Sequence, residues 1–96
     1  MSPMNIKKLI KLRKSLDKLD NEFIRLIKIR TNLVKKVLSL KENKNQIVDK
    51  KRIKFILNEI RKKSIRNKID TKITNRIWKN MIYSYIDYER RNFKKK

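Results

Sequence analysis

One stretch decides the fold, residues 12–41, which reads LRKSLDKLDNEFIRLIKIRTNLVKKVLSLK. Leucines recur in it every seven residues, at Leu12, Leu19, Leu26, Leu33 and Leu40. A second apolar set fills the complementary heptad positions, namely Leu9, Leu16, Phe23 and Val37. This spacing, with no Gly or Pro to interrupt it, predicts one continuous amphipathic helix over residues 5–41.

Such a helix is too long to be covered by the rest of the chain. At about 1.5 Å per residue it would extend for about 55 Å, well beyond the diameter of a globule of this size. Its apolar stripe therefore needs cover from another chain, and we expect an intertwined helical homodimer. The 96 residues form one domain at most, residues 1–96.

Two shorter helices are predicted after the long one. Residues 42–48 are polar and break the pattern, and Asp49 is a candidate N-cap for a second apolar stripe, formed by Ile53, Ile56, Leu57 and Ile60. Residues 64–68 form another polar break, after which Asp70 or Thr71 caps a third stripe, formed by Ile73, Ile77, Trp78, Met81, Ile82 and Tyr85. The basic tail from about residue 90 is expected to fray. Because no segment shows strand alternation, the predicted fold is all-α, with a long, a short and a medium helix.

The composition excludes several kinds of chemistry. Cys and His are both absent, which rules out disulfides, thiolate zinc sites and imidazole catalysis. Lys and Arg number 30 against 9 Asp and Glu, giving a formal net charge of +21. We favour drift toward A/T-rich codons, which encode the abundant Lys, Ile and Asn, over selected polyanion binding, and expect no nucleic-acid partner. The resulting field would still attract a dicarboxylate substrate.

The N-terminus does not resemble a targeting segment. Lysines are scattered among the apolar residues of MSPMNIKKLIKLRK, and no small-residue cleavage site follows. No run of about 18 apolar residues is present either, so no membrane partner is expected. We therefore expect a cytoplasmic protein.

Three charged residues share the apolar stripes. Arg30 occupies a heptad position that calls for an apolar residue, and Lys41 follows about three turns later at nearly the same azimuth. Glu89 continues the line of Trp78, Ile82 and Tyr85 on the third helix. Each has a structural explanation: a register device for Arg30, a snorkelling cation for Lys41 and a solvated end residue for Glu89. Together with Arg52 at the start of the second helix, they instead describe an anion pocket between helices.

With these residues in place, the sequence resembles the all-helical chorismate mutases over residues 6–89. The most specific match is residues 12–41, where leucine-arginine, leucine-aspartate, an arginine and a lysine follow the family's first-helix pattern. The second-helix start VDKKRI and the third-helix segment IDTKITNRIWKNMIYSYIDYE match less specifically.

The resemblance implies a substrate site and its residue roles. The positions that line it are Arg13, Arg30, Lys41, Asp49, Arg52, Tyr85 and Glu89. Arg30 and Arg52 would hold the substrate carboxylates, and Lys41 would bond a carboxylate and the ether oxygen. Arg13 would come from the partner subunit. The sequence separation is consistent with this implied role in the partner subunit. Arg13 and Lys41 are 28 residues apart, or about 42 Å along a helix, which is too far for both to contact one small ligand from the same chain.

The implied reaction is the rearrangement of chorismate to prephenate in aromatic amino-acid biosynthesis. It needs no enzyme nucleophile, metal or cofactor. The protein selects the compact substrate conformer by clamping its carboxylates, and it stabilises the charge that develops on the ether oxygen. Lys41, Glu89 and Arg30 are the expected catalytic residues.

Two positions depart from the family pattern. Ile53 stands where the family commonly has a glutamate that holds the substrate hydroxyl, and Tyr85 where it commonly has a serine. Asp49 or water must then carry more of the hydroxyl recognition. Glu89 replaces a common glutamine. Isochorismate pyruvate lyases look similar at the first two positions and are the nearest alternative. A basic helical nucleic-acid-binding protein is an alternative of another class, and a regulatory helical partner protein is a third.

Overall fold

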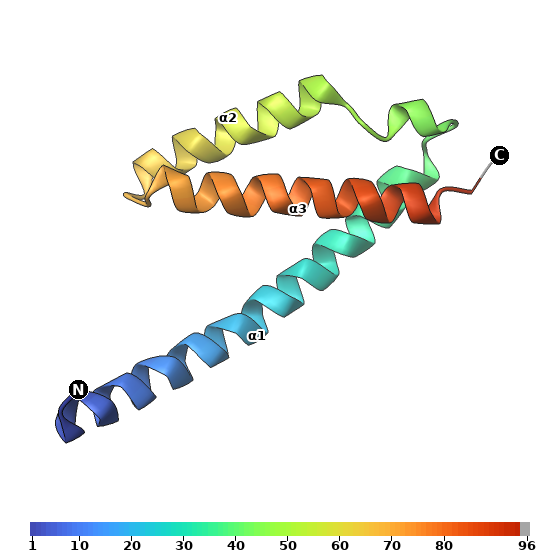
Figure 1. Cartoon of the computed structure of the whole chain (residues 1–96). Helices are drawn as coiled ribbons and strands as arrows, with labels where there is room; N and C mark the ends of the chain where they lie inside the picture. The colour runs from blue at the N-terminus through green and yellow to red at the C-terminus, as the bar shows by residue number, and fades with distance from the viewer. Residues whose placement is uncertain (95–96) are drawn as a thin grey trace. The chain divides into compact units, whose positions relative to one another are not determined.

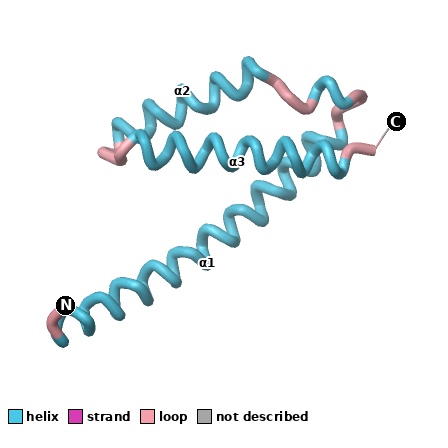
Figure 2. The backbone as a smooth tube through the Cα atoms, in the orientation of Figure 1, coloured by secondary structure: helices cyan, strands magenta, loops and turns pink. Residues whose placement is uncertain are grey.

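The computed structural model describes residues 1–94, which fold into helices alone (Figures 1 and 2). Three α-helices, α1 (Pro3–Ser39), α2 (Lys50–Arg66) and α3 (Thr71–Asn92), are joined by short connections, and the 3-10 helix η1 (Lys44–Gln46) lies between α1 and α2. The all-α prediction is confirmed, as is its order of a long, a short and a medium helix.

The chain divides into two compact units, Met1–Leu33 and Val34–Lys96, so the boundary falls inside α1. The first unit is helix throughout after its first two residues. Leu9 is half-buried. The other leucines of this unit and Phe23 are at least half exposed at both sets of heptad positions, with exposed fractions from 51% for Leu26 to 64% for Leu12. These residues make the predicted apolar stripe, which the first unit itself cannot bury. Among the described residues, no helix combines the length and apolar character needed to cross a membrane.

The second unit is built on the α2–α3 pair, whose helices run side by side in opposite directions (Figure 1). Its buried apolar core is small and consists of Leu38, Ile47, Ile82 and Ile86. Partly buried apolar side chains pack against this core, namely Val48, Ile53, Ile56, Leu57 and Phe93. The core thus joins the last turn of α1, the segment after η1 and the C-terminal half of α3.

Side-chain caps define the start of each short helix. Asp49 accepts a hydrogen bond from the backbone N–H of Arg52 at 3.0 Å, and Asp70 accepts one from Lys72 at 2.8 Å. These bonds satisfy N–H groups that have no partner within the helix, as the sequence predicts for both residues. The predicted break at residues 42–48 contains a turn of its own, because Asn43 and Gln46 form a reciprocal capping box that closes η1.

Two predicted helix boundaries are wrong by a few residues. Helix α1 ends at Ser39, so Lys41 lies just beyond it in a tight turn that is closed by bonds from Leu40 N–H to Val37 O and from Lys41 N–H to Leu38 O. Helix α2 continues through Ser64 to Arg66, whereas the sequence pattern predicts a polar break that begins at Ser64. Helix α3 ends at Asn92, so it includes the first residues of the basic tail, whose fraying stays a prediction. Lys95 and Lys96, the end of the predicted tail, lie outside the described residues.

The turn from α2 to α3 is formed without glycine. Ile69 N–H donates to Ser64 O at 2.9 Å and Lys68 N–H donates to Ile65 O at 3.1 Å, which is the Schellman arrangement at a helix end. The arrangement needs a left-handed residue, and Lys68 takes that position with φ of 56°. A residue with a Cβ atom is disfavoured there because the Cβ atom crowds the backbone, but the chain contains no Gly that could take the position.

Candidate active site

A buried ion pair joins two segments that lie far apart in the sequence. Lys41 Nζ donates to Glu89 Oε1 at 2.9 Å, across a separation of 48 residues. The Glu89 side chain is only 8% exposed and that of Lys41 18% exposed. Glu89 is placed there by the register of α3, because it follows Ile82 and Ile86 along the buried face of the helix. The prediction that Glu89 and Lys41 face inward is confirmed.

The environment of Lys41 leaves it able to bind more than Glu89. An ammonium has three N–H donors; Glu89 takes one of them, and the backbone carbonyl of Ile47 lies at 3.5 Å. Burial weakens screening by water, so each contact of this cation is stronger than it would be on the surface. The pair can therefore present a positive charge and a carboxyl group to one small polar ligand.

The N-terminal turn of α2 holds two further candidates. Asp49 caps the helix through Oδ1, and a carboxylate can accept additional bonds beyond that one. The Arg52 guanidinium is exposed and lies over the ring of Phe55, 5.3 Å from its centroid. A shallow groove of about 510 Å³ lies beside this turn, with Asp49 in its lining. Asp49 and Arg52 are thus presented from one helix turn.

The two positions that depart from the family pattern have different surroundings. Ile53 is half-buried and packs against the apolar core, so this position carries no polar group toward a ligand. Tyr85 is half-buried on α3, one turn before Glu89, on a neighbouring part of the same face.

The two candidate arginines of α1 do not come together within the chain. Arg13 is exposed and Arg30 is half-buried. They belong to the same continuous helix, and the 17 residues between them correspond to about 25 Å along its axis. One small ligand cannot contact both arginines of a single copy.

Sequence reasoning missed two groups that the structure makes important. The Ile47 carbonyl beside Lys41 is a backbone group, so its position cannot be predicted from the residue type. Ser64 is 3% exposed, donates to Ile60 O at 2.6 Å and pairs with the Thr74 hydroxyl at 2.7 Å. The available signal for Ser64 was its place four residues after Ile60, on the apolar stripe of α2.

Comparison with protein families connects this arrangement to a known activity. The model of the family described as chorismate mutase type II matches residues 12–90, which is most of the chain. The chain belongs to this chorismate mutase family. The matched region contains every candidate site residue from Arg13 to Glu89. No curated protein and no solved structure showed a significant match to the chain.

Family membership makes the chain a chorismate mutase, an enzyme that acts on chorismate. The earlier resemblance is thereby confirmed at the level of family and enzyme class. The polyanion-binding alternative does not account for the family match or for the buried Lys41–Glu89 pair.

Proposed function

We propose that the chain rearranges chorismate to prephenate in a site shared between two copies. Arg30, Lys41, Asp49, Arg52, Tyr85 and Glu89 come from one copy, and Arg13 comes from the other. The observation that carries this proposal is the Lys41–Glu89 contact of 2.9 Å, a buried charged pair within the span matched by the family.

The proposed chemistry follows from the residue types. Arg30 and Arg52 clamp the two substrate carboxylates, because a planar guanidinium bonds a carboxylate through two parallel N–H groups. Clamping selects the compact conformer in which the reacting carbons are close. The ether bond breaks while the carbon–carbon bond forms, and negative charge develops on the ether oxygen. Lys41 donates to that oxygen and stabilises the charge.

Glu89 acts on the same oxygen in its protonated form. A carboxylate can only accept hydrogen bonds and would repel the growing negative charge, whereas a carboxylic acid donates one. The ionised form instead pairs with Lys41 at 2.9 Å and occupies one of the donors that the substrate needs. Protonation therefore supplies a donor and releases Lys41 at the same time.

The shared site is supported by helix geometry within one unit. Arg13 and Arg30 lie about 25 Å apart on α1, so an arginine at position 13 can only join this site from a second copy. An antiparallel pairing of two α1 helices would bring Arg13 of one copy toward Arg30 of the other. The same pairing would cover the exposed apolar stripe of α1.

The substrate hydroxyl is assigned to Asp49. Ile53 packs against the core, which removes the glutamate that the family commonly uses there. Asp49 presents a carboxylate from the first turn of α2, and Tyr85 supplies a hydroxyl near Glu89. Isochorismate pyruvate lyases look similar to this chain at positions 53 and 85, so lyase activity is the alternative that should be measured.

The decisive experiment is a coupled assay of the purified protein with chorismate and with isochorismate. We expect prephenate from chorismate and no pyruvate from isochorismate. Lys41→Ala and Arg30→Ala should each lower kcat/KM about 10²-fold or more, because each removes preorganised charge from the site. Lys35→Ala, an exposed residue of α1, is the matched control and should keep full activity. Pyruvate release in excess of prephenate would replace the mutase assignment with the lyase.

A further inference from the structure

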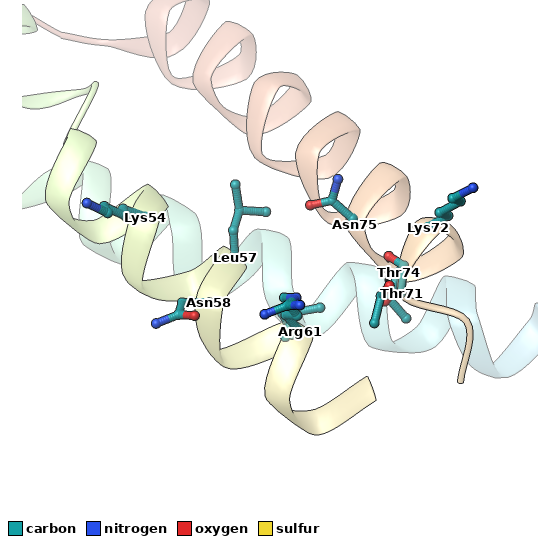
Figure 3. A pocket seen from close by; sticks show the side chains of 9 residues that line it. Lys54, Leu57, Asn58, Arg61, Thr71, Lys72, Thr74 and Asn75 are labelled. Atoms are coloured by element: carbon teal, nitrogen blue, oxygen red, sulfur yellow. Dashed lines mark hydrogen bonds between the residues drawn. The ribbon is translucent and has the colours of Figure 1, made fainter. Parts of the chain in front are cut away.

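A second cavity lies between α2 and the start of α3, and its lining reaches from Thr71 on α3 to Lys54 on α2. It has a volume of about 500 Å³, within the range of small-molecule sites, and is shown in Figure 3. Its lining comes from Lys54, Leu57, Asn58, Ile60, Arg61, Thr71, Lys72, Thr74 and Asn75. Asn75 and Glu89 are 14 residues apart on α3, or about 21 Å, so one small ligand cannot occupy both places.

The helices around this cavity are fixed by polar contacts. The hydroxyls of Ser64 and Thr74 pair at 2.7 Å and join α2 to α3 directly beside the cavity. The turn that follows α2 is held by its two Schellman hydrogen bonds, and Asp70 caps the start of α3. The cavity is therefore formed before any ligand arrives, which lowers the entropic cost of binding.

The lining is positively charged and contains no carboxylate. Lys54, Arg61 and Lys72 contribute three cations, and no ion pair of theirs occurs within residues 1–94. Two acidic residues that neighbour the lining in the sequence have other contacts: Glu59 lies 3.7 Å from Lys62, and Asp70 caps the start of α3. An anion in this cavity would thus find Arg61 in the lining, Lys54 and Lys72 at the rim, and no acidic residue in the lining.

The remaining lining suits a ligand with an apolar body. Leu57 and Ile60 are partly buried apolar residues of α2, while Asn58 and Asn75 supply amides. In Figure 3, Thr71 and Thr74 lie together at the start of α3, Arg61 lies on the facing part of α2, and Leu57 and Asn75 extend into the space between the two helices. A guanidinium suits a carboxylate, since both are planar and bond bidentately.

We infer that this cavity binds a small carboxylate that carries an apolar ring. Arg61 holds the carboxylate, Lys54 and Lys72 add charge from the rim, and the ring lies on Leu57. This second site is separate from the site of the mutase reaction, and its occupation does not require Arg30, Lys41 or Glu89.

The test uses phenylacetate as the probe, measured by calorimetry and by NMR titration of the full chain without substrate. We expect saturable binding of one phenylacetate per chain. Benzyl alcohol, which lacks the charge, and inorganic phosphate, which lacks the ring, should each bind at least tenfold more weakly. Arg61→Gln should weaken phenylacetate binding at least tenfold. Lys79→Gln, an exposed α3 residue outside the lining with the same change in charge, should leave binding unchanged.

Several outcomes would overturn the inference. Binding that survives Arg61→Gln but is lost in Arg30→Ala would place phenylacetate in the mutase site. Equal binding of benzyl alcohol would show that the charge has no role. Absence of binding, together with loss of self-association in Leu57→Lys, would identify the cavity as a contact between copies. Because Arg61→Gln should keep mutase activity, failure of this site and failure of the proposed function remain distinguishable.

Discussion

The role proposed for Glu89 depends on whether its carboxyl group is protonated. Its carboxyl group is buried against Lys41, and the proposed reaction uses it as a hydrogen-bond donor. We therefore expect mutase activity to rise as the pH falls below neutrality. Glu89→Gln should flatten this dependence and raise the rate at higher pH, because an amide donates a hydrogen bond at every pH. The measurement is the pH profile of kcat and kcat/KM for both proteins.

Two controls accompany the Glu89→Gln comparison. Self-association is measured at each pH, so that a change in assembly is not mistaken for a change in chemistry. Glu42→Gln alters an exposed acid near Lys41 in the sequence and should leave the wild-type profile unchanged. Identical profiles for the wild type and Glu89→Gln would mean that Glu89 does not face the ether oxygen.

Lys41 and Glu89 could be predicted as site residues from the sequence because each is a charged residue on an otherwise apolar stripe. A charge on an apolar stripe costs several kcal/mol unless it finds a partner, so Lys41 and Glu89 could be recognised as inward-facing before their contact was known. The partnership itself depends on how the end of α1 meets α3, which no local pattern specifies. No comparable energetic cost marks Ser64 in the sequence. Its hydroxyl can donate a hydrogen bond to the carbonyl of Ile60 within the same helix, so its burial costs little free energy.

At the scale of elements, helix starts were easier to predict than helix ends. Asp49 and Asp70 cap their helices with side chains, which leave a clear mark in the sequence. The ends of α1 and α2 are instead closed by backbone hydrogen bonds, and the usual glycine signal is missing because the chain contains none. This explains why the sequence pattern predicts a first helix that includes residues 40–41 and a break that includes residues 64–66.

Lys68 offers a stability test of the turn from α2 to α3. Its φ of 56° is the left-handed conformation that glycine adopts without steric cost. We expect Lys68→Gly to raise the free energy of unfolding by about 1 kcal/mol, measured by denaturant titration at fixed protein concentration. Lys63→Gly, within α2, should instead lower it by about 1 kcal/mol.

A charge control completes the Lys68 experiment. Lys68→Ala removes the same positive charge but keeps the Cβ atom, so it should not reproduce the gain. If alanine stabilises the protein as much as glycine, the effect comes from relief of charge repulsion, and the argument from backbone conformation fails.

At the scale of the whole molecule, we expect a homodimer. The apolar residues along the first unit are mostly at least half exposed, and a stable monomer would leave this long stripe in water. Sedimentation should therefore give about twice the chain mass of 11.8 kDa. Leu19→Lys, in the middle of the stripe, should weaken association, whereas Lys18→Gln beside it should not. A folded, active monomer at micromolar concentration would refute the dimer.

Shared sites lead to a separate prediction about mixed subunits. Arg13→Ala and Arg30→Ala should each remove most activity, yet mixing the two variants should restore part of it. In a mixed dimer one site receives both arginines and the other loses both, so complete exchange would restore about a quarter of the wild-type activity. Activity is measured after exchange has been verified with labelled subunits. Full exchange without recovery would exclude a role for Arg13 across the interface.

The exposed stripe of α1 also bears on how the chain folds. Val34–Lys96 has its own small core, whereas Met1–Leu33 has no buried residue of its own. The second unit can then form in a unimolecular step, while protection of the first waits for a collision with another copy. Refolding should accordingly show a late phase whose rate grows with protein concentration, and the amides of residues 3–33 should gain protection from hydrogen exchange only in that phase.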